Sequence, residues 1–211
     1  MKFRPQVHRI LTLGLAAACV TACATPYTGP VEVTRFVSDN PSQLGSGTIF
    51  AVIDGSPNDE LRDLTYRNAV ASELRDLGYL LDPAGPAEQV ATIRVQRIAI
   101  NDSEGDRSPV SVGVGGRTGS YGSGVGLGIG INLGGGGSKL RVVTTLSMQI
   151  RDEKTEETLW EGRAELVTSE DADLTDVEAS APILAAALFR EFPGGNGETI
   201  TIDTNDLQET Q

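Results

Sequence analysis

The histidine and cysteine side chains, which act as bases, nucleophiles or metal ligands in many enzymes, all lie at the start of this 211-residue chain. Its one histidine, His8, and both of its cysteines, Cys19 and Cys23, lie within the first 23 residues. Three basic residues there precede a largely apolar run at 10–20, which is the pattern of a secretory signal that is removed on export. An exported chain would then keep no histidine and no thiol beyond Cys23. Ser-His-Asp and Cys-His catalysis and the usual His/Cys zinc sites are therefore excluded.

Cys23 is the residue for which a chemical role is predicted. The sequence Val20-Thr21-Ala22-Cys23 resembles the lipobox of bacterial lipoproteins, whose cysteine is acylated and becomes the new N-terminus. Cys19 is a second candidate, and ordinary cleavage that leaves Cys23 a free thiol is the alternative. An acylated cysteine would anchor the chain, because two or more acyl chains hold a protein stably at a membrane.

The residue after the cysteine bears on the choice of membrane. Ala24 stands where an Asp commonly retains such lipoproteins in the inner membrane. We therefore expect a lipid anchor in the outer membrane, with the periplasmic side preferred over the surface.

Carboxylates are the remaining candidates for chemistry. The acids at 152–157 fall in an expected hairpin turn, where we interpret them as solvated charge and not as the acid/base pair of a glycosidase. Four acids at 170–176 could hold Ca²⁺ through oxygen, but they lack the Asp-x-Asp-x-Asp-Gly order of a calcium loop. No catalytic residue, metal ligand or cofactor is predicted, and a hydrolase using carboxylates alone is the least favoured function.

The charge balance limits the classes of partner. The chain has 17 basic and 29 acidic residues, a net charge of -12. This balance argues against nucleic acid, whose phosphates need a basic surface, and against docking on anionic lipid through a basic patch. The expected partners are a membrane, reached through the N-terminal lipid, and either an envelope protein or a second copy of the chain.

Hydrophobic patterning predicts the elements. Apolar runs and alternation indicate five strands, at 31–37, 48–53, 91–100, 140–150 and 159–167. In the third strand the apolar phase slips after Val95, which suggests a bulge at Gln96-Arg97. A sheet of this kind, mostly antiparallel, would carry helices on one face as a two-layer α+β sandwich.

Two helices are predicted to form the second layer. Ser56 and Pro57 are typical of a helix start, and Gly78 suits the left-handed residue after a helix end, with Tyr79 packing behind it. Pro182 is expected to open or kink a final helix that ends near Phe192.

A glycine-rich insertion precedes the fourth strand. Of the 25 glycines, 13 lie between residues 113 and 137, without the Gly-x-Gly-x-x-Gly or Walker order of a phosphate loop. Val125, Leu127, Ile129 and Ile131 alternate with glycine and so share one face of an extended segment. We interpret the insertion as a mobile hairpin or loop. The alternative is that its aliphatic face meets lipid, a partner or another copy, and the period of two disfavours a helical glycine zipper.

Several motifs, taken in order, resemble the bacterial lipoprotein family called domain of unknown function 4136. They are Gly47-Thr48, Leu74-x-x-Leu77-Gly78-Tyr79, the glycine-rich insertion, Leu159-Trp160-Glu161-Gly162-Arg163-Ala164, Ala187-Leu188-Phe189 and Phe192-Pro193-Gly194. The resemblance covers about residues 31–197 and implies an envelope lipoprotein with a small α+β domain, no established activity and no catalytic residues. The insertion departs from its relatives in holding only one aromatic residue, Tyr121.

The expected organisation is a signal peptide at 1–22, a lipidated tether at 23–30, an α+β domain at 31–197 that includes the insertion at 111–138, and a polar tail at 198–211. The expected function is a non-enzymatic outer-membrane lipoprotein whose domain binds or supports an unknown ligand, with self-association through the glycine-rich hairpin as the alternative. Trp160 is a possible interaction residue, although core packing beside a Glu161–Arg163 pair is the simpler interpretation.

Overall fold

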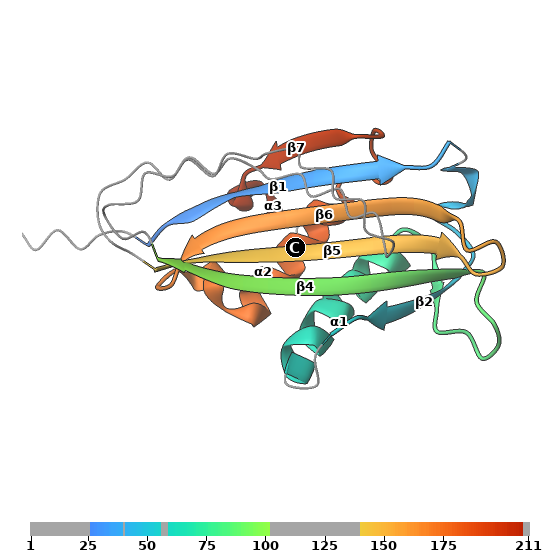
Figure 1. The fold of residues 1–211 in the computed structure, drawn as a ribbon, viewed down its shortest axis with the longest axis horizontal. Coiled ribbons are helices and arrows are strands. Elements are labelled where there is room, and N and C mark those ends of the chain that lie inside the picture. Colours follow the sequence, from blue (N-terminus) through green and yellow to red (C-terminus); the bar gives the residue numbers. More distant parts are fainter. Residues whose placement is uncertain (1–25, 40, 56–58, 102–139, 209–211) are drawn as a thin grey trace, which may run out of the picture.

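A computed structural model describes residues 26–39, 41–55, 59–101 and 140–208 (Figure 1). The strands are β1 (Thr28–Val37), β2 (Thr48–Ile53), β3 (Leu80–Leu81), β4 (Gln89–Asn101), β5 (Leu140–Asp152), β6 (Thr158–Ser169) and β7 (Glu198–Ile202). The helices are α1 (Glu60–Asp76), α2 (Val177–Phe189) and α3 (Thr204–Gln208), with short 3-10 turns η1 (Pro41–Gln43) and η3 (Asp173–Thr175).

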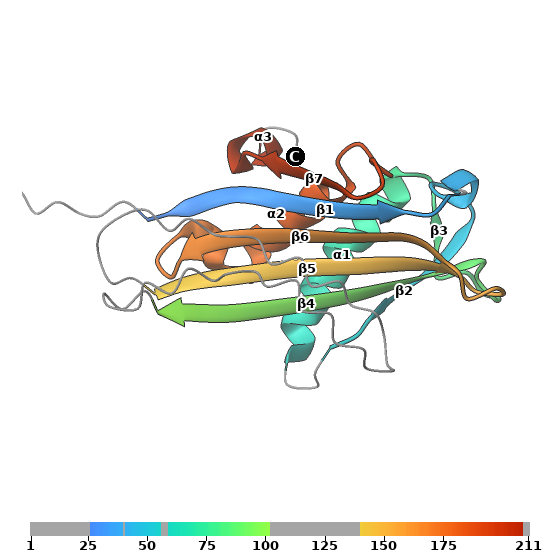
Figure 2. The ribbon, with the colours of Figure 1, turned by 45° about the horizontal axis from the view of Figure 1, so that its top comes forward.

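All seven strands form one sheet in the order β3-β2-β4-β5-β6-β1-β7. The strand β2 is parallel to both β3 and β4, and every other pair is antiparallel. The helices α1 and α2 lie side by side on one face of the sheet (Figures 1 and 2). The predicted α+β class is therefore confirmed, and the sheet is larger than the expected five strands.

The two additional strands lie at the edges. The strand β3 is only two residues long, too short to leave an alternating pattern. The segment from residue 198, expected to be a polar tail, instead pairs with β1 as β7 and continues into α3. Ile202 and Leu207 anchor it, since each is buried in the core.

The predicted bulge in β4 is wrong. The pairing of β4 with β5 runs without a shift from Gln89 opposite Asp152 to Asn101 opposite Leu140. The apolar phase slips because Ile98 and Ile100 point to the outer face of the sheet, away from the helices. Ile98 is 58% exposed there.

The predicted end of α1 is confirmed. Gly78 has φ +104, its N–H donates to the Arg75 carbonyl, and the Tyr79 N–H donates to the Leu74 carbonyl. These two bonds form the Schellman motif, in which a left-handed residue satisfies carbonyls at a helix end. The predicted start at Ser56 and Pro57 lies outside the described residues. In α2, Pro182 lies inside the helix and does not open it.

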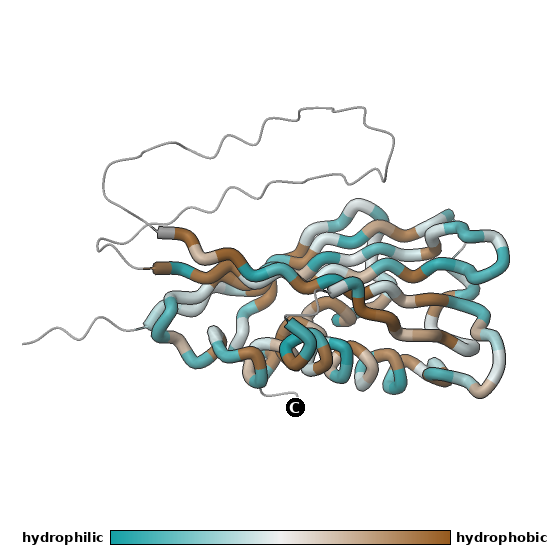
Figure 3. Tube along the Cα trace, turned by 60° about the horizontal axis from the view of Figure 1, so that its bottom comes forward, coloured by the Kyte–Doolittle hydropathy of each residue, from teal (hydrophilic) through white to brown (hydrophobic). Residues whose placement is uncertain are grey.

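The core lies between the helices and the face of the sheet that they cover. Hydrophobic and polar residues alternate along both layers in Figure 3, as expected where each element buries one face. Tyr66 and Leu74 of α1, Leu184 of α2 and Trp160 of β6 are fully buried. No helix in the described part of the chain is long and apolar enough to cross a bilayer.

Candidate functional site

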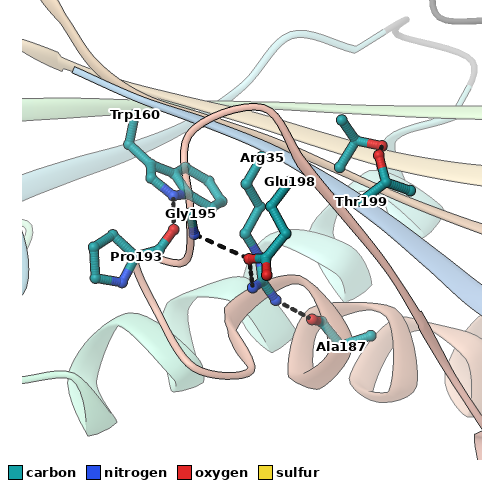
Figure 4. Close-up of polar contacts among 8 residues, drawn as sticks. Arg35, Trp160, Ala187, Pro193, Gly195, Glu198 and Thr199 are labelled. Atoms are coloured by element: carbon teal, nitrogen blue, oxygen red, sulfur yellow. Dashed lines mark hydrogen bonds and ion pairs between the residues drawn. The ribbon is translucent and has the colours of Figure 1, made fainter. Parts of the chain in front are cut away.

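Trp160 lies at the centre of an aromatic cluster between β6 and the end of α2. Its side chain is 0% exposed. The indole stacks on Phe189 with ring centroids 5.9 Å apart and an interplanar angle of 7°, and Phe192 lies 5.3 Å away at a tilt. The indole Nε1–H donates to the Pro193 carbonyl at 2.9 Å (Figure 4). A buried tryptophan needs such an acceptor, and this bond holds the exit of α2 against the sheet.

Gly162 makes room for the indole. It lies two residues after Trp160, on the same face of β6. A Cβ at this position would be 2.1 Å from Cη2 of Trp160. The ring therefore lies flat over the glycine. This packing explains why a glycine stands two residues after Trp160.

Arg35 is the second element of this site. In the sheet Arg35 lies opposite Gly162, and it is 1% exposed. Its Nη2 donates to the Ala187 carbonyl at 3.2 Å, in the last turn of α2. Its Nη1 is 4.0 Å from Oε2 of Glu198, and neither Nε nor Nη1 has a hydrogen-bond partner (Figure 4).

Burial has the largest effect on the pKa of Arg35. Loss of solvation lowers the pKa of the guanidinium, and the charges of Glu198 and Glu191 act in the opposite direction. Glu198 is half-exposed and also accepts the Gly195 N–H at 2.9 Å, so it joins the loop after α2 to the start of β7.

The sequence favoured core packing for Trp160, did not predict its aromatic partners, and missed Arg35. Its signal was the alternation Val31, Val33, Arg35, which puts the arginine on the buried face of β1. Nothing in its local sequence identifies its acceptor, because Ala187 lies 152 residues away.

These contacts hold the loop after α2 against the sheet. They present no reactive group to solvent. Trp160 was a candidate for contact with a partner, and its burial leaves it no surface to offer in this conformation. Arg163 was expected to pair with Glu161, and it instead holds Glu165 at 2.7 Å.

The carboxylates do not form a facing pair in the described residues. The buried ones are Asp63 on α1, which is held by Arg62 at 2.8 Å, and Glu165 on the outer face of β6. They therefore lie on opposite sides of the sheet. In the exposed turn after β5, Asp152 accepts the backbone N–H groups of Thr155 and Lys154, which lower its pKa.

Among the residues described, no three potential metal ligands gather, including the acids at 170–176. A hollow of about 290 Å³ lies at the end of the sheet where β1 begins. Thr28, Leu174 and Asn205 line it, with Asp173 as its one carboxylate.

Two predicted features lie outside the described residues. They are the lipidation site, Cys23, and the aliphatic face of the insertion, made by Val125, Leu127, Ile129 and Ile131.

Comparisons with known proteins give a family and a few distant folds. A family described as domain of unknown function (DUF4136) matches residues 35–194. No curated protein matches the chain.

Among solved structures, a PelC dodecamer from Paraburkholderia phytofirmans is 13% identical with a TM-score of 0.42, covering 75% of this chain and 94% of that one. A variant of it is 10% identical with a TM-score of 0.41 and the same coverage. A PDZ domain protein from Parabacteroides distasonis is 16% identical with a TM-score of 0.46, covering 84% of this chain and 38% of that one.

Proposed function

The chain belongs to the DUF4136 family, and we propose that it is a lipid-anchored, non-enzymatic outer-membrane protein whose α+β domain binds or supports another envelope component. The family assignment agrees with the resemblance in the sequence. The lipid anchor, the location and the binding role are the proposal.

The position of the tether carries this proposal. Only residues 24–27 separate Cys23 from Thr28, the first residue of β1. The ends of β4 and β6 and the start of β5 lie at the same end of the sheet (Figure 1). An acyl group on Cys23 would therefore hold the sheet by this tether end.

The far end of the domain would then point away from the lipid. The strand β5 has 13 residues, which corresponds to a length of roughly 40 Å. The turn at 152–157 would extend from the membrane by about this distance, and a partner could approach both it and the sheet faces beside it.

The outer face of the sheet is the surface that we propose for the partner. The helices cover the opposite face (Figure 2). Toward the far end the outer face carries the exposed side chains of Phe36, Arg94 and Glu161. An aromatic residue among charges of both signs is a composition suited to protein contact, because it combines apolar area with polar specificity.

The anchor is tested by intact mass and membrane fractionation of the protein from its own host, with Cys23→Ser as the control. We expect a chain that starts at Cys23, carries acyl groups and is recovered in the outer membrane, and we expect Cys23→Ser to lose the acyl groups and the recovery in the outer membrane. A soluble chain with an unmodified Cys23 would overturn the anchor.

The binding role is tested by photo-crosslinking in the same host. A crosslinker at Glu161, on the outer face, is compared with one at Ser72, which is exposed on α1. We expect a discrete crosslinked partner from Glu161 and not from Ser72. No crosslink from the outer face, or equal crosslinking from both positions, would contradict it.

A further inference from the structure

The outer face of the sheet carries an apolar strip near the tether end. Ile98 of β4 lies opposite Val143 of β5, which in turn lies opposite Val167 of β6. These three side chains, which we call the apolar strip, cross three neighbouring strands in one row. Ile98 is 58% exposed, Val167 is partly exposed, and Val143 between them is 8% exposed, while the helices α1 and α2 lie on the other side of the sheet.

The strip differs from the row beside it on the side away from the tether end. The next row toward the far end consists of Gln96, Thr145 and Glu165. A row of branched aliphatic residues beside a polar row, on a face that α1 and α2 do not cover, is an apolar surface on which another segment can pack.

The nearest available cover is the chain itself. Residues 102–139 connect β4 to β5, and they leave and re-enter the sheet at Asn101 and Leu140, which pair with each other. Asn101 is three residues from Ile98 along β4, and Leu140 is three residues from Val143 along β5. A hairpin connection between paired strands needs as few as about two residues, whereas this one has 38.

The composition of the segment matches the strip. Val125, Leu127, Ile129 and Ile131 alternate with glycine, so an extended conformation would collect them on one face. Residues 102–139 also carry three acidic and three basic residues, so no net charge opposes their approach to an acidic domain.

We propose that the aliphatic face of residues 125–131 docks on the apolar strip of its own sheet. The strip is about 10 Å wide across its three strands, a width that a few extended residues can cross. Attachment at both ends gives the segment an effective concentration on the order of millimolar at the strip, which favours it over a second copy. The proposal rests on the fold and is independent of lipidation.

Disulfide trapping tests this contact in the full chain. In a background that carries both Cys19→Ser and Cys23→Ser, Leu127→Cys is combined either with Ile98→Cys or with Ala99→Cys. Ala99 is the next residue of β4, is also exposed, and points to the opposite face. Because a disulfide needs Cα atoms within about 7 Å, the first pair should close within one chain about tenfold faster than the second.

Intact mass and non-reducing electrophoresis at low protein concentration measure the closure. Val167→Cys paired with Leu127→Cys is a second variant on the strip, and circular dichroism of the reduced proteins checks that each is folded. Closure from both strip positions and slower closure from Ala99→Cys would support the proposal. Equal closure from the two faces, or no closure within the chain, would overturn it, and disulfide-linked dimers would assign the strip to a second copy.

Discussion

The guanidinium of Arg35 is buried where the sheet meets the last turn of α2. Its bond to the Ala187 carbonyl is favourable, because a helix C-terminus carries partial negative charge. Its attraction to Glu198 is weakened by solvent, since that carboxylate is 44% exposed. Two of its nitrogens, Nε and Nη1, lack a hydrogen-bond acceptor. Arg35 therefore acts mainly by packing against the loop at 193–197, and less as an ion-pair partner.

The packing of Trp160 over Gly162 gives a prediction for a single methyl group. We expect Gly162→Ala to lower the free energy of unfolding by about 1–3 kcal/mol. The indole cannot move aside easily, because Phe189, Phe192 and the Pro193 carbonyl hold it. Urea denaturation measures the change.

The matched control is Gly85→Ala, where a Cβ would meet nothing within 4 Å. It should alter the free energy of unfolding by less than about 0.5 kcal/mol. Equal effects at the two glycines would show that the indole is not confined.

Tyr66 gives a prediction about alkaline pH. Burial raises its pKa above the ordinary value of 10.0, although the hydrogen bond to Ser180 and the charges of Arg97 and Arg62 oppose the change. Above pH 10 the unfolded chain loses this proton first, so the folded state binds more protons and its stability falls as pH rises.

We therefore expect Tyr66→Phe to reduce the loss of stability between pH 8 and 11, which urea denaturation at each pH measures. At neutral pH the variant should cost only about 0.5–1.5 kcal/mol, since the Ser180 hydroxyl still donates to the Asp176 carbonyl. Tyr27→Phe, at an exposed position, is the control. An unchanged pH profile in Tyr66→Phe would contradict the prediction.

At the scale of elements, periodicity predicted the long strands and the end of α1 because those signals are local. It missed β7, since the alternation Thr199, Ile200, Thr201, Ile202 spans one short strand amid polar residues. It also led to the wrong prediction of a bulge before Ile98. Alternation shows that the two faces of a strand differ, but it does not show which face the helices cover. Arg35 was missed for a related reason, as its surroundings are assembled from strands and a helix far apart in the sequence.

The edge strand β7 is expected to contribute to stability. Truncation after Gly197 removes the buried side chains of Ile202 and Leu207 and should lower the free energy of unfolding by about 3 kcal/mol or more. It also bares the edge of β1, so the truncated protein should associate more readily. Urea denaturation and light scattering measure the two effects.

A graded variant keeps this test informative if the truncated chain fails to fold. Leu207→Ala should cost about 2–5 kcal/mol, whereas Gln208→Ala, at the exposed neighbouring position, should be nearly neutral. A harmless truncation would restore the interpretation of this segment as a loose tail.

At the scale of the whole molecule, the sheet has a direction set by the two ends of its long strands. Glu170, just beyond β6, lies at the tether end, and Lys154 lies in the turn at the far end. Both are exposed, and β6 between them has 12 residues, a separation of roughly 40 Å. An acylated Cys23 would make the first position membrane-proximal and the second distal.

Fluorescence quenching in vesicles tests this orientation. A fluorophore is attached to Glu170→Cys or to Lys154→Cys in the acylated protein, and the vesicles carry a lipid with a quencher in its headgroup region. Because such quenching is short-ranged, we expect strong quenching at residue 170 and little at residue 154. The same labels on a chain that also carries Cys23→Ser should not be quenched at either position. Equal quenching at both positions would mean that the sheet lies flat on the membrane, and stronger quenching at residue 154 would reverse the proposed orientation.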